Sequence, residues 1–194
     1  MSTTSVTTGK VRFSYVQVFQ PKSVIEGGEP KFSVCLIIDK SDKKTLTAIK
    51  QAVNAAMEPV KGKFKGGKPP KSFKLPLRDG DEERPDSPEF ANSYFLNARS
   101  NRKPGLVDAR LNPIDDPAKL YSGCYGRAHI NFYAFSVPGN SGVAVGLNHL
   151  QKTADGDPLG GAVASAFDVF EVEEDSFEDS DILGGSEDDE DDLF

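Results

Sequence analysis

The charge of the last 24 residues, 171–194, constrains the fold of this chain more than any other feature. They contain thirteen Asp or Glu residues and no Lys or Arg. A segment with so many like charges and so few apolar side chains cannot bury enough surface to offset the entropy lost when its backbone is ordered. We therefore expect 171–194 to be a disordered acidic tail, and 1–170 to hold one folded domain.

Setting the tail aside reverses the sign of the net charge. The whole chain has 23 basic and 30 acidic residues, a net charge of −7. Because thirteen of the acidic residues lie in the tail, residues 1–170 keep all 23 basic residues against 17 acidic ones, a net charge of +6. A basic body favours nucleic acid as a partner, and an attached polyanion can compete for the same cations or recruit a protein.

The composition also narrows the cellular setting. There is no run of about 18 apolar residues that would span a membrane, and the N-terminus lacks the basic and apolar regions of a secretory signal. Without an export signal, Cys35 and Cys124 are expected to be reduced core thiols rather than a disulfide. The Ser/Thr-rich residues 1–8 are expected to be flexible. These features predict a cytosolic protein that makes no membrane contact.

Period-2 patterns predict a mainly β domain. Residues 11–19 and 31–38 are rich in β-branched and aromatic side chains and are separated by Glu26-Gly27-Gly28-Glu29-Pro30, which favours a hairpin-like pair of strands. Later strands are predicted at 93–100, 106–110 and 125–135, and from Val143 onward. The sum is a mostly antiparallel β fold with one helix.

That helix is predicted at 42–57, where apolar residues recur with a helical period. Ser41 or Asp42 is its expected N-cap, and Pro59 is expected to end it. A long charged loop, 60–89, should follow without regular structure. Its first part holds seven basic residues interleaved with two Phe, and its second part is mostly acidic.

Two predicted strands align an aromatic residue with cations. In 125–135 the alternation puts Arg127 and Tyr133 on the outer face, and around Phe95 it puts Phe95 and Arg99 on one face. Cations and aromatic rings together can bind the phosphates and bases of one strand. The alternative is a solvated face that binds nothing. The residues predicted to bind DNA are Lys61, Lys63, Phe64, Lys65, Lys68, Lys71, Phe73, Lys74, Arg78, Phe95, Arg99, Arg102, Arg127 and Tyr133.

Enzyme motifs find little support. Residues 62–69 fit a phosphate-binding loop until Pro69 replaces the Ser or Thr that would hold a metal. Cysteine and histidine pairs at metal-binding spacing are missing, so we expect no metal, no cofactor and no catalysis. Two alternatives remain open: a metal-dependent nuclease or recombination enzyme that uses the acids of 79–89, and a DNA mimic that acts through its tail.

Several segments in order resemble a known family: Asn97-Ala98-Arg99-Ser100, Arg102-Lys103-Pro104-Gly105-Leu106-Val107-Asp108, Leu120-Tyr121-Ser122-Gly123-Cys124-Tyr125, Ile130-Asn131-Phe132-Tyr133-Ala134-Phe135, Gly146-Leu147-Asn148-His149-Leu150-Gln151-Lys152 and Asp155-Gly156-Asp157-Pro158-Leu159-Gly160. The chain is similar to the single-stranded-DNA-binding proteins of tailed bacteriophages. The resemblance implies an OB-type antiparallel β-barrel with extended loops. It also implies sequence-nonspecific, non-catalytic binding of single-stranded DNA in phage DNA replication, recombination or repair, in the cytoplasm of the infected bacterial host.

The same resemblance extends to the acidic tail. Its end, Asp191-Asp192-Leu193-Phe194, is similar to the C-terminal hook with which such proteins engage replication or recombination partners. Self-association or cooperative assembly on DNA is left open. In the usual OB order the helix follows the third strand, whereas this sequence shows two strands before Ser41.

Overall fold

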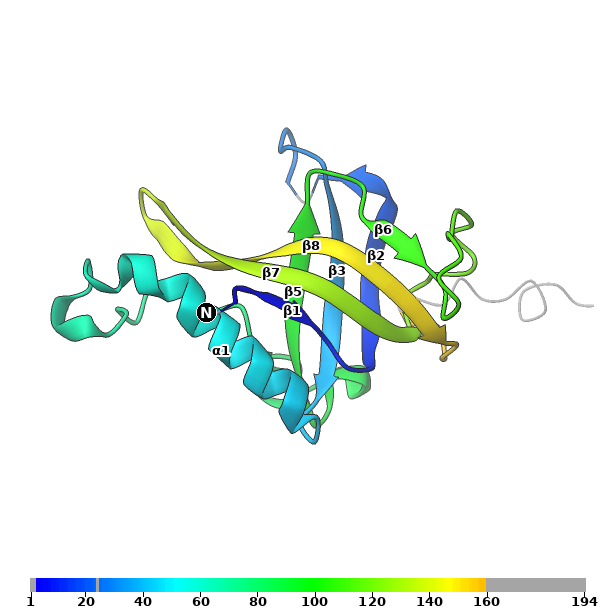
Figure 1. The fold of residues 1–194 in the computed structure, drawn as a ribbon, viewed down its shortest axis with the longest axis horizontal. Coiled ribbons are helices and arrows are strands. Elements are labelled where there is room, and N and C mark those ends of the chain that lie inside the picture. Colours follow the sequence, from blue (N-terminus) through cyan, green and yellow to red (C-terminus); the bar gives the residue numbers. More distant parts are fainter. Residues whose placement is uncertain (1–2, 24, 160–194) are drawn as a thin grey trace, which may run out of the picture. The chain divides into compact units, whose positions relative to one another are not determined.

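The structure is a computed structural model that describes residues 3–23 and 25–159 (Figure 1). The predicted acidic tail, the domain boundary at 170 and the hook residues Asp191, Asp192, Leu193 and Phe194 lie outside the described residues and stay predictions. The elements in chain order are β1 (Ser5–Thr7), β2 (Val11–Lys22), β3 (Lys31–Asp39), α1 (Lys43–Lys61), η1 (Lys65–Gly67), β4 (Arg78–Asp79), α2 (Gly80–Glu83), η2 (Pro88–Phe90), β5 (Ser93–Ser100), β6 (Gly105–Val107), β7 (Tyr125–Val137) and β8 (Asn140–Ala154).

Five strands close into a ring in the order β2–β3–β5–β8–β7, with β7 pairing back to β2. Every pairing in the ring is antiparallel except that of β5 with β8, which is parallel. The ring of strands and the one main helix confirm the predicted mainly β fold. Five strands is also the number in an OB-type barrel. The helix lies between the second and third strands of the ring in chain order. Three strands precede it rather than the two that the sequence shows, because β1, which pairs with β7, is an additional strand.

Helix α1 covers one side of the barrel and lies closest to β7 (Figure 1). Its face of Leu46, Ile49 and Val53 is buried in the main core, and the Asp42 side chain accepts a hydrogen bond from the Thr45 N–H at 3.1 Å, as an N-cap does. The prediction that Pro59 ends the helix was wrong. Pro59 lies in the last turn of the helix, and it lacks only its own backbone N–H. The helix tolerates this loss because several carbonyls of the last turn have no partner within the helix in any case.

The N-terminal residues were predicted to be flexible, and from Ser5 onward this was wrong. Strand β1 pairs antiparallel with β7, and its central residue, Val6, is 6% exposed. The Thr8 N–H donates to the Ala128 carbonyl at 2.9 Å, and its hydroxyl accepts from the Ala128 N–H at 3.0 Å. Backbone pairing therefore orders a segment whose polar side chains gave no strand signal.

The charged loop is only partly irregular. Strand β4, which pairs with β5, spans the junction of the two halves, and α2 lies in the acidic half. The Lys40 ammonium donates to Asp79 at 2.9 Å and to Asp81 at 2.6 Å, which lowers the pKa of both carboxyls and raises the pKa of Lys40. These two ion pairs hold the acidic half of the loop against the end of β3.

The basic half forms an arm, residues 62–73, whose side chains are exposed except for Phe64 and Phe73. The arm leaves the end of α1 on the same side of the molecule as the tip of the β7–β8 hairpin (Figure 1). Its two phenylalanines meet edge-to-face, with the Phe64 and Phe73 ring centroids 5.1 Å apart. The Lys74 N–H then donates to the Ser141 carbonyl at 2.9 Å, which ties the end of the arm to β8.

Candidate nucleic-acid interface

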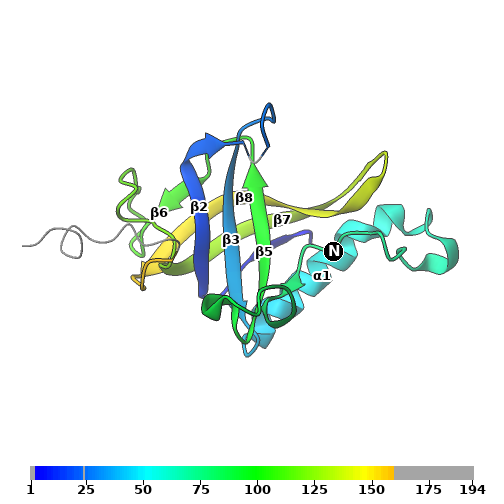
Figure 2. The ribbon, with the colours of Figure 1, turned by 180° about the vertical axis from the view of Figure 1, so that it is seen from behind.

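A single row of residues crosses all five strands of the ring. The registers pair Gln17 with Ser33, Ser33 with Arg99, Arg99 with Gly146, and Gly146 with Asn131. Neighbours in register point to the same side of a sheet, and Arg99 is exposed, so the row lies on the outer surface. A Cβ on Gly146 would lie 2.4 Å from the Asn131 side-chain oxygen, so the Asn131 side chain lies directly over the glycine. Figure 2 shows β2, β3 and β5 side by side on this surface.

Four hollows share Arg99, and we call them together the Arg99 groove. Two lie toward β2 and the β2–β3 loop, with volumes of about 460 and 330 Å³. The other two lie toward β7 and β8, with volumes of about 510 and 330 Å³. Each hollow shares further residues with the next, so the groove is continuous along the sheet.

The groove is strongly cationic. Among the described residues that line it, Glu29 is the one acidic side chain. The basic ones are Lys22, Lys31, Lys74, Arg78, Arg84, Arg99 and Arg102. Arg78 also pairs with Glu83 outside the lining. A surface of this kind attracts a polyanion.

Exposed aromatic rings stand among these cations. Tyr133 is 50% exposed and Tyr15 56% exposed, and the half-buried Phe135 lies beside Tyr133 in the same hollow. The expected exposure of Phe95 was wrong, because its ring is only 1% exposed. The alternation does put Phe95 on the face of Arg99, but Phe90 covers it edge-to-face at 5.1 Å. Its ring forms part of the buried lining of the hollow of about 460 Å³ and presents almost no exposed surface.

Other predicted residues lie outside the groove. Phe73 is 8% exposed in the main core, and Phe64 packs against that core, so neither ring presents a free face to a base. Arg127 donates to the Thr8 carbonyl at 3.0 Å, beside β1. Lys61 pairs with Glu58. The lysines that belong to the arm and do not line the groove are Lys63, Lys65, Lys68 and Lys71.

The predicted residues that the structure brings together in the groove are Lys74, Arg78, Phe95, Arg99, Arg102 and Tyr133, with Phe95 as a buried part of its lining. Sequence reasoning missed Lys22, Lys31 and Arg84, because each is a single cation at the end of a strand or helix. It also missed Tyr15. A signal for Tyr15 does exist: Val11 and Phe13 are odd-numbered whereas Val16 and Val18 are even-numbered, which indicates an extra residue between the two pairs.

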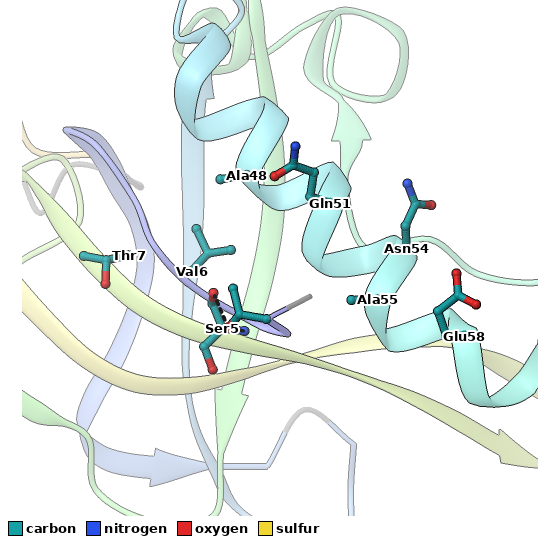
Figure 3. Close-up of a pocket in the computed structure, with 9 residues that line it drawn as sticks. Ser5, Val6, Thr7, Ala48, Gln51, Asn54, Ala55 and Glu58 are labelled. Atoms are coloured by element: carbon teal, nitrogen blue, oxygen red, sulfur yellow. Dashed lines mark hydrogen bonds between the residues drawn. The ribbon is translucent and has the colours of Figure 1, made fainter. Parts of the chain in front are cut away.

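A larger hollow, about 690 Å³, lies between β1 and α1 (Figure 3). Its lining consists of short polar and apolar side chains, among them Gln51 and Asn54 of the helix. Glu58 is the one ionised side chain among the described residues that line it. Without a cation to meet a phosphate, this hollow does not suit nucleic acid.

The acids required by the nuclease alternative are not among the described residues that line the groove. Asp79 and Asp81 are engaged by Lys40. Within 3–23 and 25–159, no three His, Cys, Asp or Glu residues gather closely enough to hold a metal ion. No helix in that part of the chain is long and apolar enough to cross a membrane.

Both cysteines are free and buried, as predicted. Desolvation raises the pKa of the Cys35 thiol to about 12, although the Arg84 and Arg78 charges act in the opposite direction. A thiol in this state remains protonated and packs as a small apolar group beneath the groove.

Comparisons with known proteins agree on one family. Residues 4–192 match the family of the Enterobacter phage Enc34 ssDNA-binding protein. Protein p50 of Acyrthosiphon pisum secondary endosymbiont phage 1 is 30% identical over 166 residues, which cover 80% of this chain and 86% of that protein.

Solved structures show the same likeness. The single-stranded DNA-binding protein from bacteriophage Enc34, in complex with ssDNA, has a TM-score of 0.67 and 27% identity, and the match covers 81% of this chain and 90% of that chain. The single-stranded DNA-binding protein gp2.5 of bacteriophage T7 has a TM-score of 0.59 at 11% identity, covering 86% and 98%, and shows likeness of fold alone. Because the family match spans nearly the whole sequence, this chain belongs to the Enc34 family of phage ssDNA-binding proteins.

Proposed function

We propose that this protein binds single-stranded DNA in the Arg99 groove with little sequence preference. The observation that carries the proposal is the row through Arg99, which joins all five barrel strands on one cationic surface with Tyr15 and Tyr133 exposed beside it. OB-type barrels bind oligonucleotides on the face of their second and third strands and on the adjoining loops. Here those strands are β3 and β5.

Binding uses two kinds of contact. Lysine and arginine side chains neutralise phosphates, and a lysine does so without fixed geometry. Aromatic rings stack on bases, and every base has a face that can stack. Neither contact depends on the identity of the base, so the expected preference is for single strands rather than for a sequence.

The arm extends the interface beyond the groove. Lys74 lines the groove, and the exposed Lys63, Lys65, Lys68 and Lys71 continue outward from it. We assign these lysines, together with Lys61, to phosphates of a strand long enough to leave the groove at this end.

In the cell, the protein protects and presents single strands during phage DNA replication, recombination or repair in the cytoplasm of the infected host, without catalysing a reaction itself. The acidic tail competes with DNA for the cations of the body. Its end, with Asp191, Asp192, Leu193 and Phe194, recruits replication or recombination proteins. The proposal of competition rests on the charge of the tail. The proposal of recruitment rests on the resemblance of the tail end to the C-terminal hook of such proteins.

Fluorescence anisotropy with matched single-stranded and duplex DNA, with and without Mg²⁺, tests the proposal. Arg99→Ala should weaken single-strand binding by about 10-fold or more, because a charge-assisted contact is lost. Lys50→Ala, an exposed cation on α1, is the control and should bind as wild type does. If Arg99→Ala and Lys50→Ala bind single strands with equal affinity, the Arg99 groove is not the binding site. Mg²⁺-dependent cleavage of the DNA would favour the nuclease alternative.

A further inference from the structure

Tyr15 has a backbone conformation that is sterically unfavourable for a residue with a bulky side chain. Its φ is +47°, in the left-handed region that glycine adopts easily and a bulky residue does not. The strain sits in a one-residue β-bulge: Ser14 pairs with Cys35 and Gln17 with Ser33, so Tyr15 and Val16 together face one residue of β3. The Val16 N–H donates to the Ser122 hydroxyl at 3.0 Å, which anchors the bulge.

Packing does not explain a tyrosine at this position. The Tyr15 side chain is 56% exposed and forms no part of either buried cluster of the described residues. Glycine would relieve the strain and lose little buried surface. A strained conformation that the fold does not need points to a function of the side chain.

The ring stands at the wall of the hollow of about 460 Å³ at the β2 end of the Arg99 groove. Small side chains, Ser33 and Cys35, leave space on the strand beneath it. Amides that can meet the edge of a base, Gln17 and Asn97, line the same hollow.

Cations complete the hollow. Its ionised lining residues among those described are Lys22, Arg84 and Arg99. The Arg84 guanidinium is fixed over two buried rings, 5.6 Å from the Phe90 centroid and 5.9 Å from the Phe95 centroid. A planar cation held in this way is available at the wall of the hollow without further ordering.

We propose that this hollow, the Tyr15 pocket, receives one unstacked nucleobase, which stacks on the Tyr15 ring while the adjoining phosphates lie against Lys22 and Arg99. The inference rests on the proposed function. It adds that Tyr15 distinguishes single strands from duplex, because a base inside a duplex is paired and stacked and cannot enter the pocket. The strain at φ +47° places the ring at the mouth of the pocket before DNA arrives.

The affinity test uses the full-length chain and a fluorescein-labelled oligo(dT), with a duplex of the same length for comparison. Tyr15→Ala should weaken binding to oligo(dT) by about 5- to 150-fold, the fold-change that corresponds to loss of one stacked base. Tyr15→Phe should restore most of this affinity. Duplex binding by Tyr15→Ala should stay at the wild-type level, so the preference for single strands falls.

The stability test separates this role from a structural one. Tyr15→Gly should melt at or above the wild-type temperature, by up to about 4 °C, because the strain is relieved, and yet bind oligo(dT) as weakly as Tyr15→Ala. The matched control is Leu111→Gly. Leu111 is also strained, with φ +66°, is 70% exposed and does not line the groove, so its replacement should leave affinity unchanged.

The outcomes are distinguishable. If wild type binds oligo(dT) while Tyr15→Ala and Tyr15→Gly bind within twofold of it, the Tyr15 pocket is refuted and the proposed function stands. If wild type itself fails to bind oligo(dT), both are refuted. Photocrosslinking of 5-bromodeoxyuridine oligonucleotides to Tyr15, mapped by mass spectrometry, would support the pocket directly. Crosslinks that fall on Tyr133 and never on Tyr15 would count against it.

Discussion

The salt dependence of DNA binding can show which cations contact phosphate. Seven basic side chains line the Arg99 groove. If each neutralises one phosphate, a plot of log affinity against log salt should have a slope of about −5, since each neutralised phosphate of a single strand contributes about −0.7. Between 50 and 200 mM salt, that slope corresponds to about a thousandfold loss of affinity.

Two triple variants that remove equal charge can locate the contacts. The groove variant is Lys31→Gln, Arg99→Gln and Arg102→Gln, and the arm variant is Lys63→Gln, Lys65→Gln and Lys68→Gln. On a strand of about 8 nucleotides, within the site sizes of OB domains, the groove variant should flatten the slope by about 2. The arm variant should leave it unchanged there, because its lysines lie outside the groove.

A longer strand gives the second half of the test. On about 30 nucleotides, a length beyond one OB site, DNA leaving the groove beside Lys74 reaches the arm, so the arm variant should also flatten the slope. The assay is fluorescence anisotropy at five or more salt concentrations, with circular dichroism to verify folding. The reasoning is refuted if the arm variant flattens the slope on the short strand while the groove variant does not.

Three further outcomes follow from the structure. Phe95→Ala should lower the free energy of unfolding by about 3–5 kcal/mol in urea titrations, because the ring is buried against Phe90; a stable variant with weakened DNA binding would instead restore Phe95 as a stacking residue. Lys40 lowers the pKa of Asp79 and Asp81. These two carboxylates therefore stabilise the fold at pH values above the unfolded pKa of about 3.9, and this stabilisation is lost as pH falls through the lower folded pKa values. The melting temperature, measured as a function of pH, should fall less on the acid side in Lys40→Met than in wild type. Truncation after Phe170 should tighten binding to single strands most at low salt, where the tail competes best, and equal affinity of the two forms at low salt would exclude competition.

Local patterns in the sequence predicted the local features of the fold. The alternation in β7 placed Ala128, Ile130 and Phe132 in the core, where each is at most 2% exposed. It also left Tyr133 outside. These predictions succeed because the period of a strand depends only on consecutive residues. The N-cap of α1 was predictable for the same reason, since the Asp42 side chain bonds a backbone group three residues away.

The exposure of a side chain could not be predicted from the sequence where another segment of the chain covers that side chain. Phe95 has the same pattern as an exposed aromatic, but Phe90 folds back over it from the turn before β5. The arm lysines form the densest basic run in the sequence, yet the arm leads away from the sheet because Phe64 and Phe73 close its base. Density of charge in the sequence is therefore a poor guide to position on the surface.

The Arg99 groove is formed by residues that lie far apart in the sequence, so no single segment of the chain indicates it. Arg99 gains its neighbours because β3 and β8 both pair with β5, which brings Ser33 and Gly146 to its two sides. Those partners are 66 and 47 residues away in the chain, so no window of sequence contains them together. Each strand contributes one or two ordinary polar residues, and only closure of the barrel gathers them into a surface. A surface built in this way depends on the register of the strands more than on any one cation. A shift of β5 by one residue would point the Arg99 side chain toward the core.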